Sequence, residues 1–176
     1  MPVESQIDVN EFDCGNSSIN CLVSKSVFST VLNQTKTYKV TIKSNRVGFF
    51  AISILGISLE DSDAQIAAYY EGTPSYGAVK VDFIAVERCV QKRGIGTVVL
   101  EYLVKDARTL SEHWPVRLLF LDALRNKVDW YIGKGFAPLN SADLSGDSPT
   151  VRLYIDLMSA EEKEKLDYYI QNSIDY

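Results

Sequence analysis

The sequence has little of the chemistry that binds metals or forms disulfide bonds. It contains one histidine, His113, and three cysteines, Cys14, Cys21 and Cys89, with no Cys-x-x-Cys pair. An odd cysteine count without such a pair is typical of reduced thiols in a cytosolic protein. A single histidine cannot supply a cluster of His and Cys ligands. We therefore expect three free thiols and no metal site.

Long apolar runs are also missing. No stretch approaches the roughly 20 residues that cross a bilayer, and no charged-then-apolar leader opens the chain. We therefore predict a cytoplasmic protein with no membrane partner. The net charge of −5 argues against an extended nucleic-acid surface, although it is compatible with a local basic cleft. A length of 176 residues fits one domain with a substantial core.

The two most familiar nucleotide-binding loops are absent as well. A Walker A loop ends in Gly-Lys-Ser/Thr, but here Gly96 is followed by Thr97 and Val98. A dinucleotide fingerprint needs a third glycine, and Val99 stands at that position. Any nucleotide-like ligand would therefore need a different kind of loop.

Such a loop is present at residues 91–97, Gln-Lys-Arg-Gly-Ile-Gly-Thr. An apolar run at 81–86 predicts a strand before it. After the loop, apolar residues recur roughly three or four positions apart, which predicts a helix with one apolar face: Ile95, Val99, Tyr102, Ala107 and Leu110. Glu101, Lys105 and Arg108 lie on its opposite side. The loop therefore opens a helix.

A helix start leaves about four backbone N–H groups without internal partners and carries partial positive charge. That arrangement binds anions through the main chain. Gly94 and Gly96 allow a ligand to approach the backbone, and Lys92 and Arg93 add two positive charges. The loop predicts a cradle for phosphate or pyrophosphate, and the simpler alternative is a tight, solvated turn.

Three segments resemble one known family. Gln91-x-x-Gly94-x-Gly96 resembles the acyl-CoA signature of the GNAT acetyltransferases, Q/R-x-x-G-x-G/A. Tyr131-x-x-x-Gly135-Phe136 resembles a late element of the same family. Phe12-Asp13-Cys14-Gly15, followed by an amphipathic helix, resembles the start of the GNAT branch that contains aminoacyl-tRNA-acetylating toxins. The resemblance covers about residues 5–158.

The resemblance implies an α/β fold with a mixed twisted sheet of six or seven strands and helices on both faces. It implies a GNAT-like acetyltransferase domain over residues 1–158. Residues 159–176 would form a helical extension, opened by a capping box at Ser159 and Glu162. Leu166, Tyr169 and Ile170 of this extension could pack on the domain or on a second subunit, which would make a homodimer.

The implied activity is direct transfer of an acetyl group from acetyl-CoA, the cosubstrate, to a primary amine. The acceptor would be a small-molecule or peptide amine, and nucleic acid would enter only as aminoacyl-tRNA. A toxin of the latter kind, with or without a paired antitoxin, is one alternative. A CoA-binding module without catalysis is another.

The resemblance also assigns residues. Tyr131 corresponds to the general acid near the CoA sulfur, and a core tyrosine is the simpler alternative. Position at the end of the central strand, not the resemblance, makes Glu87 the candidate base, with Asp82 as its competitor and ordered water as another proton path. Asn126 corresponds to a pantetheine contact, although its spacing from Tyr131 is shorter than usual and a helix N-cap is an equal alternative. The cofactor-binding main chain and side chains would be Ile84, Ala85, Val86, Gln91, Lys92, Arg93, Gly94, Ile95, Gly96 and Thr97.

The remaining elements follow from periodicity and turn chemistry. Asn16–Ser18 offers a cap for a helix whose face is Ile19, Leu22, Val23, Val27 and Val31. Asn45-Arg46 is expected to turn between strands at 37–43 and 47–57, and the irregular stretch 59–77 could hold a short helix at 63–70. Further strands are expected at 78–86, 116–121, 136–139 and 151–157, and further helices at 125–134 and from 159 to about 171.

Overall fold

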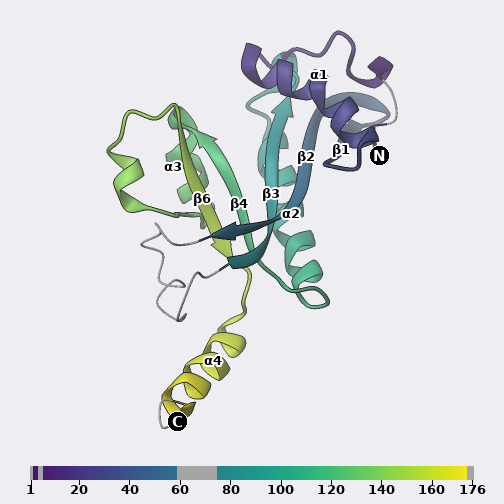
Figure 1. Ribbon diagram of the computed structural model, residues 1–176. Helices are drawn as coiled ribbons and strands as arrows, with labels where there is room; N and C mark the ends of the chain where they lie inside the picture. Colours follow the sequence, from purple (N-terminus) through teal and green to yellow (C-terminus); the bar gives the residue numbers. More distant parts are fainter. Residues whose placement is uncertain (1, 4–5, 59–74, 174–176) are drawn as a thin grey trace. The chain divides into compact units, whose positions relative to one another are not determined.

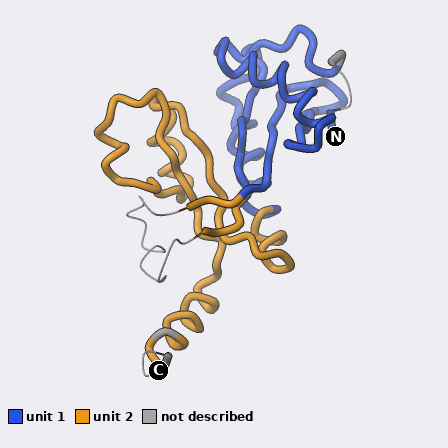
Figure 2. Tube along the Cα trace, viewed as in Figure 1, with its two compact units in different colours: residues 1–55, 79–106 blue, residues 56–78, 107–176 orange. Residues whose placement is uncertain are grey.

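The computed structural model describes residues 2–3, 6–58 and 75–173. The chain divides into two compact units, each built from two separate segments (Figure 2). Unit 1 contains residues 1–55 and 79–106, and unit 2 contains residues 56–78 and 107–176. The cradle loop, residues 91–97, therefore belongs to unit 1, and Tyr131 belongs to unit 2.

The elements follow one another along the chain as shown in Figure 1. From the amino terminus these are η1 (Gln6–Val9), α1 (Ser17–Val31), β1 (Lys36–Ile42), β2 (Asn45–Ser58), β3 (Ser75–Val86), η3 (Arg88–Val90) and α2 (Ile95–Ser111). Then come β4 (Val116–Leu124), η4 (Arg125–Lys127), α3 (Val128–Ile132), β5 (Ala137–Pro138), η5 (Ser141–Leu144), β6 (Thr150–Asp156) and α4 (Ala160–Ser173). The predicted helix at 63–70 lies outside the described residues.

The described strands form a mixed six-stranded sheet in the order β1-β2-β3-β4-β6-β5. In unit 1, α1 packs its Val23 and Val27 with Phe49 and Phe83 of the sheet. The neighbouring Phe50 lies on the opposite face of β2, where its ring contacts Tyr102 of α2 with centroids 6.2 Å apart. The predicted α/β fold, with six strands and helices on both faces, is confirmed.

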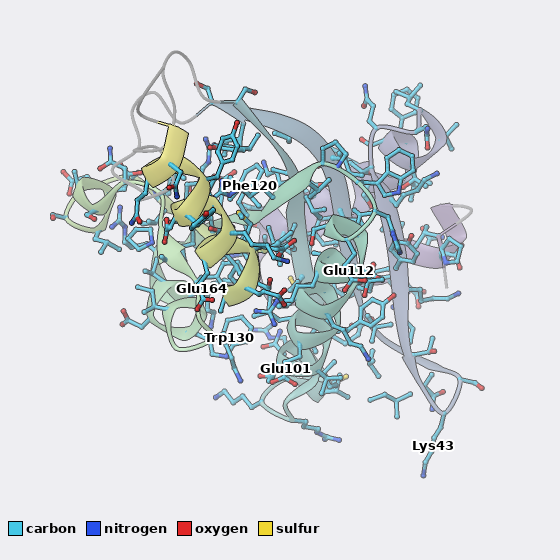
Figure 3. All side chains as sticks on the ribbon, turned by 90° about the horizontal axis from the view of Figure 1, so that it is seen from below. Lys43, Glu101, Glu112, Phe120, Trp130 and Glu164 are labelled. Atoms are coloured by element: carbon cyan, nitrogen blue, oxygen red, sulfur yellow. The ribbon has the colours of Figure 1, made fainter. Side chains whose placement is uncertain are left out.

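The turn between β1 and β2 lies two residues before the predicted turn at Asn45-Arg46. Ile42 pairs with Asn45, so the hairpin loop is Lys43-Ser44, and Asn45-Arg46 already belongs to β2. Lys43 lies at the tip of this hairpin (Figure 3). Both loop residues have positive φ, 48° and 67°, as a two-residue hairpin turn of the favoured twist requires. Neither is a glycine, which is why the turn was not recognised from composition.

The buried faces of α1 and α2 also differ from the predicted ones. On α1, Leu22 and Val31 are exposed and Ser26 is buried; its hydroxyl donates to the Val23 carbonyl at 2.7 Å, which satisfies it inside the core. On α2, Tyr102 is exposed, and the buried residues are Val99, Leu100, Leu103 and Ala107. The predicted faces were drawn through the apolar residues. The buried serine on α1 and the exposed tyrosine on α2 show that residue type alone does not locate the buried face.

In unit 2, β4 continues three residues beyond the predicted end at Leu121. Asp122 pairs with Arg152 of β6 and also forms an ion pair with it at 2.9 Å, which extends the antiparallel ladder. The single helix predicted at 125–134 is instead η4 followed by α3, which packs against β4 and β6. The strand predicted at 136–139 is reduced to the two residues of β5, which pair with β6.

The terminal helix α4 begins with the predicted capping box. Ser159 N donates to Glu162 Oε2 at 2.7 Å, and Glu162 N donates to Ser159 Oγ at 3.2 Å. Tyr169 is 69% exposed, so it does not pack on the domain, and Leu166 is half-buried. The side chain of Ile170 lies outside the described residues. Packing of this helix on a second subunit stays a prediction.

The core of unit 1 predicts where truncation is costly. Phe49 is fully buried, whereas Ile54 on the same strand is 65% exposed. Phe49→Ala should lower the free energy of unfolding by about 3–5 kcal/mol, because it removes a fully packed ring and leaves a cavity. The matched change Ile54→Ala should cost far less. Urea denaturation of the three proteins checks this, and equal losses for the two variants would contradict the assigned core.

Candidate functional site

The loop at residues 91–97, the cradle, joins the end of β3 to the start of α2. Val98 N donates to Gly94 O at 3.1 Å, and this is the first hydrogen bond of the helical kind. The N–H groups of Ile95, Gly96 and Thr97 precede it, so they have no partner within the helix. They lie where the helix carries its partial positive charge. The predicted strand, loop and helix are confirmed. Free amides at a helix start suit anions, and the binding of an anion here stays a prediction.

The space beside the cradle glycines is open. A Cβ placed on Gly94 or on Gly96 would meet no atom within 4 Å among the described residues. Gly94 has φ +79°, a conformation that favours glycine, whereas Gly96 lies within α2 and has no such requirement. A ligand can therefore approach the main chain at both positions, and Gly96 is the one where a side chain would block the ligand without straining the backbone.

The positive charge of the cradle comes from Lys92 and Arg93, which are both exposed. Lys92 adopts φ 61°, two residues before the similarly left-handed Gly94. Left-handed residues within a turn are a feature of main-chain concavities that bind anions. The cradle thus combines main-chain donors with two side-chain cations.

Gln91 turns its side chain toward the protein. Its Nε2 donates to Cys14 O at 2.7 Å and to Val86 O at 2.9 Å. Nε2 carries both protons of the amide, and both are engaged by main-chain carbonyls. The side chain of Gln91 therefore ties the first residue of the cradle to the end of β3 and to the amino-terminal segment, a role that its place in the signature did not indicate.

Glu87, the candidate base, lies in an ion pair. Arg46 donates to Glu87 Oε1 from Nε at 3.0 Å and from Nη2 at 2.6 Å. Glu87 N also donates to Val47 O at 2.9 Å, so side chain and main chain both tie this residue to the start of β2. These contacts give Glu87 a structural role. Asp82, the competing base, accepts a hydrogen bond from Ser53 Oγ at 3.2 Å.

Arg46 is a residue that sequence reasoning missed. Besides Glu87, it donates from Nη1 to the carbonyls of Asp8 and Asn10, at 3.2 and 2.7 Å. Its guanidinium lies 5.8 Å from the ring centre of Phe12 and 5.6 Å from that of Phe49. Arg46 thereby fastens the amino-terminal segment to the sheet, and no local pattern could have revealed so many distant partners.

The strand end that the resemblance assigns to pantetheine is Ile84, Ala85 and Val86 of β3. Ala85 is buried, and Ile84 and Val86 are half-buried on the other face. A Cβ on Gly48 of β2 would clash with Ala85 O, so the backbones of β2 and β3 approach closely there. Val86 O already accepts from Gln91 and keeps one lone pair.

Tyr131 lies on α3 in unit 2. Its ring packs edge-on against Trp130 and Phe136, with centroids 4.7 and 5.6 Å apart. Burial raises the pKa of the Tyr131 phenol to about 12. Within the described part of unit 2, no hydrogen-bond partner of the hydroxyl is seen. The group is therefore a neutral, protonated donor at physiological pH.

The Tyr-x-x-x-Gly-Phe pattern has a local explanation. Phe136 N and Lys134 N both donate to Tyr131 O, at 3.2 and 2.9 Å, which closes the end of α3. Gly135 has φ +90° in this turn, a value that favours glycine. The turn brings the Phe136 ring back onto Tyr131 and holds the phenol in place.

Asn126 is exposed and lies within η4. The N-cap position of α3 is Lys127, which makes no side-chain cap hydrogen bond, so the N-cap alternative for Asn126 is wrong. The preceding residue, Arg125, donates four hydrogen bonds to carbonyls of Asp143, Leu144 and Ser148. Arg125 fixes the η5 loop beside η4, and it too was missed from the sequence.

Within the described residues, the cysteines, the histidine and the possible metal ligands form no second site. All three cysteines are free, as predicted, and burial raises the pKa of the Cys14 thiol. His113 is exposed. Over residues 2–3, 6–58 and 75–173, no group of three or more His, Cys, Asp or Glu could hold a metal ion. In the same residues, no helix has the length and apolar character needed to cross a bilayer.

Comparison with solved structures identifies the fold. A bacterial toxin matches with TM-score 0.68 and 19% identity, over 97% of this chain and 94% of that one. A mutant of KacT matches with TM-score 0.71 and 16% identity, over 94% and 98%. The chain has a GNAT-like fold.

A third structure, AtaT complexed with acetyl-methionyl-tRNAfMet, has TM-score 0.68 and 18% identity, over 90% of this chain and 91% of that chain. No family model matches the sequence, and no curated protein matches it. At such low identity the GNAT-like fold is what these structures share with this chain.

Proposed function

We propose that the protein is an acetyl-CoA-dependent N-acetyltransferase, in which the cradle binds the pyrophosphate of the cosubstrate. The observation that carries this proposal is the start of α2, where three main-chain amides, two open glycines and two exposed cations meet. A solved structure of similar fold, AtaTR, is bound with AcCoA (TM-score 0.68, 16% identity). The residues present fit such a group, because the cradle offers donors and leaves room for phosphate oxygens.

When bound, acetyl-CoA would supply an activated thioester, which the protein's residues would hold. Amides of Ile95, Gly96 and Thr97 would donate to pyrophosphate oxygens, with Lys92 and Arg93 as counter-charges. Main-chain groups of Ile84, Ala85 and Val86 are proposed to hold the pantetheine arm, and Asn126 to contact it. Holding two reactants in a reactive orientation is worth up to roughly 7–11 kcal/mol.

Tyr131 is proposed to act at the sulfur. The amine nitrogen bonds to the carbonyl carbon and releases a proton to solvent or a base such as Glu87, while the C–S bond breaks with its electron pair on sulfur. A phenol with a pKa of about 12 holds its proton more tightly than a thiol with a pKa of about 8.5. The hydroxyl therefore stabilises the developing thiolate as a hydrogen-bond donor, and completes protonation only if the site lowers its pKa.

Two acceptors are proposed: a small-molecule or peptide amine, and the α-amine of aminoacyl-tRNA. The second is favoured by the similarity to AtaT, whose structure contains acetyl-methionyl-tRNAfMet. The net charge of −5 opposes it, because tRNA binding rests largely on phosphate electrostatics. The basic cradle residues are assigned to pyrophosphate in this proposal, so tRNA would need other cations.

The acceptor is tested by following thiol release from acetyl-CoA with a panel of amines, peptides and charged tRNAs. We expect release with at least one class, and loss of release when the amine is blocked in advance. Release with charged tRNA that falls steeply as salt rises would select the tRNA acceptor. Binding of CoA without release for any class would leave a CoA-binding module and overturn the enzymatic proposal.

The cofactor site is tested by Gly96→Asp. The new Cβ meets open space, so the variant should fold, but its carboxylate would occupy the position proposed for pyrophosphate oxygens and repel them. We expect calorimetry to show CoA affinity reduced by at least about 100-fold, close to 3 kcal/mol. Gly146→Asp in the loop after η5 makes the same chemical change outside the cradle and should bind CoA normally. Unchanged affinity in folded Gly96→Asp would place the cofactor elsewhere.

The role of Tyr131 is tested by Tyr131→Phe, which keeps the packed ring and removes the donor. We expect kcat to fall by at least roughly tenfold with the KM for acetyl-CoA nearly unchanged, as for a group that acts only in the transition state. In the parent protein, ionisation of Tyr131 should not lower kcat as pH rises through the ordinary tyrosine value of about 10, because its pKa is raised.

Tyr168→Phe, at an exposed site on α4, is the matched control and should keep the parent kcat. A parent-like kcat in Tyr131→Phe, measured where chemistry limits the rate, would reduce Tyr131 to a packing residue.

A further inference from the structure

The amino-terminal segment before α1 forms a hydrogen-bonded loop at residues 12–16. Asn20, in the first turns of α1, contacts two consecutive residues of this loop. Its Nδ2 donates to Asp13 Oδ1 at 2.9 Å, and its Oδ1 accepts from Cys14 N and Cys14 Sγ, both at 3.0 Å. Asp13 Oδ1 also accepts from Gly15 N at 2.7 Å. One amide thus fixes the course of the whole 12–16 loop.

The same loop holds the segment that leads into the cradle. Cys14 O accepts from Gln91 Nε2 at 2.7 Å, and Asp13 O accepts from Arg88 N at 2.9 Å. Asp13 Oδ2 lies 3.7 Å from Arg88 Nη1, and the Arg88 side chain lies along Gly15, whose added Cβ would be 3.4 Å from Arg88 Nε. The 12–16 loop therefore contacts Arg88, the first residue of η3, and Gln91, the first residue of the cradle.

The loop is itself anchored in the core of unit 1. Phe12 and Cys14 pack against a buried cluster that includes Phe49 and Phe83, and the Phe12 ring meets the Phe49 ring at 5.1 Å. The bonds of Asp13 with Gly15 and Asn20, and that of Gln91 with Cys14, are exposed, whereas the two that Asn20 accepts from Cys14 are partly buried. Exposed hydrogen bonds of this kind add little to global stability. Together these hydrogen bonds connect α1, through the 12–16 loop, to Gln91, and this connection restrains the first residue of the cradle backbone.

We propose that Asn20 is a positioning residue for the cofactor site, acting through the 12–16 loop and Gln91 on the main chain of the cradle. This inference rests on the proposed function, since it assumes that the cradle binds CoA. Anion binding by main-chain amides depends on their alignment, and small displacements of binding groups can be costly. Asn20 and Gln91 form one chain of contacts, so removing either breaks the same connection.

The test measures CoA affinity by calorimetry and steady-state kinetics on the full chain. Asn20→Ala should weaken CoA binding roughly tenfold, because the three hydrogen bonds of its side chain that hold the loop are lost. The kcat at saturating acetyl-CoA should stay near the parent value. Gln91→Ala should show a similar loss, and the double variant should be little worse than either single one, because the effects are not independent.

Asn16→Ala provides a control that separates positioning from helix stability. Asn16, the last residue of the loop, is the N-cap of α1, and its side chain accepts from Ile19 N at 3.1 Å; the bond that it accepts from Cys14 Sγ at 3.7 Å goes to its main-chain carbonyl, which the variant keeps. This variant should lower Tm and leave CoA affinity unchanged. Exchanging the polar pair, Asp13→Asn with Asn20→Asp, restores a donor facing an acceptor and should recover most of the affinity lost in Asn20→Ala.

Each outcome decides the proposal. Unchanged CoA affinity in folded Asn20→Ala, or an equal loss in Asn16→Ala, overturns the positioning role and leaves the proposed function intact. If Asn20→Ala does not fold, Gln91→Ala carries the test, because its side chain is exposed, and unchanged affinity there overturns the role equally. If the parent protein itself does not bind CoA, the proposed function fails and this inference fails with it.

Discussion

A helix can bind an anion at its first turn only if the chain that enters it is held in place. The amides of Ile95, Gly96 and Thr97 are donors that the helix itself leaves unsatisfied, and their direction is set by the few residues before them. Here those residues are tied at both ends of η3, by Glu87 to Arg46 and by Gln91 to Cys14. The proposed chemistry depends on this restraint more than on any single charged side chain.

The restraint is effective because it joins polar contacts to the apolar core. Arg46 hydrogen-bonds Glu87 while its guanidinium lies against Phe12 and Phe49. Phe12 in turn carries the loop that receives Gln91. Exposed hydrogen bonds alone would exchange readily with water, but here the packing of the half-buried Phe12 ring on the buried Phe49 ring limits the movement of the groups that make them.

The sequence predicted the parts of this arrangement that depend on local spacing. The strand, glycine loop and helix around Gly94 and Gly96 are local patterns, as is the capping box at Ser159, and the structure contains them. The contacts of Gln91 and Arg46 could not be predicted, because their partners lie far away in the chain. The Lys43-Ser44 turn could not be predicted, because lysine and serine are not residue types that favour positive φ.

The interleaved composition of the two units bears on how the protein is made. Unit 1 needs residues 79–106 as well as its first 55, so it cannot be completed until the segment 56–78, which belongs to unit 2, has already been synthesised. Domains tend to fold as their residues emerge from the ribosome. A nascent chain that has reached residue 106 carries the 12–16 loop, Gln91 and the whole cradle, but it still lacks Tyr131. Vectorial synthesis therefore completes the loop proposed to bind the anion before the residue proposed to serve catalysis.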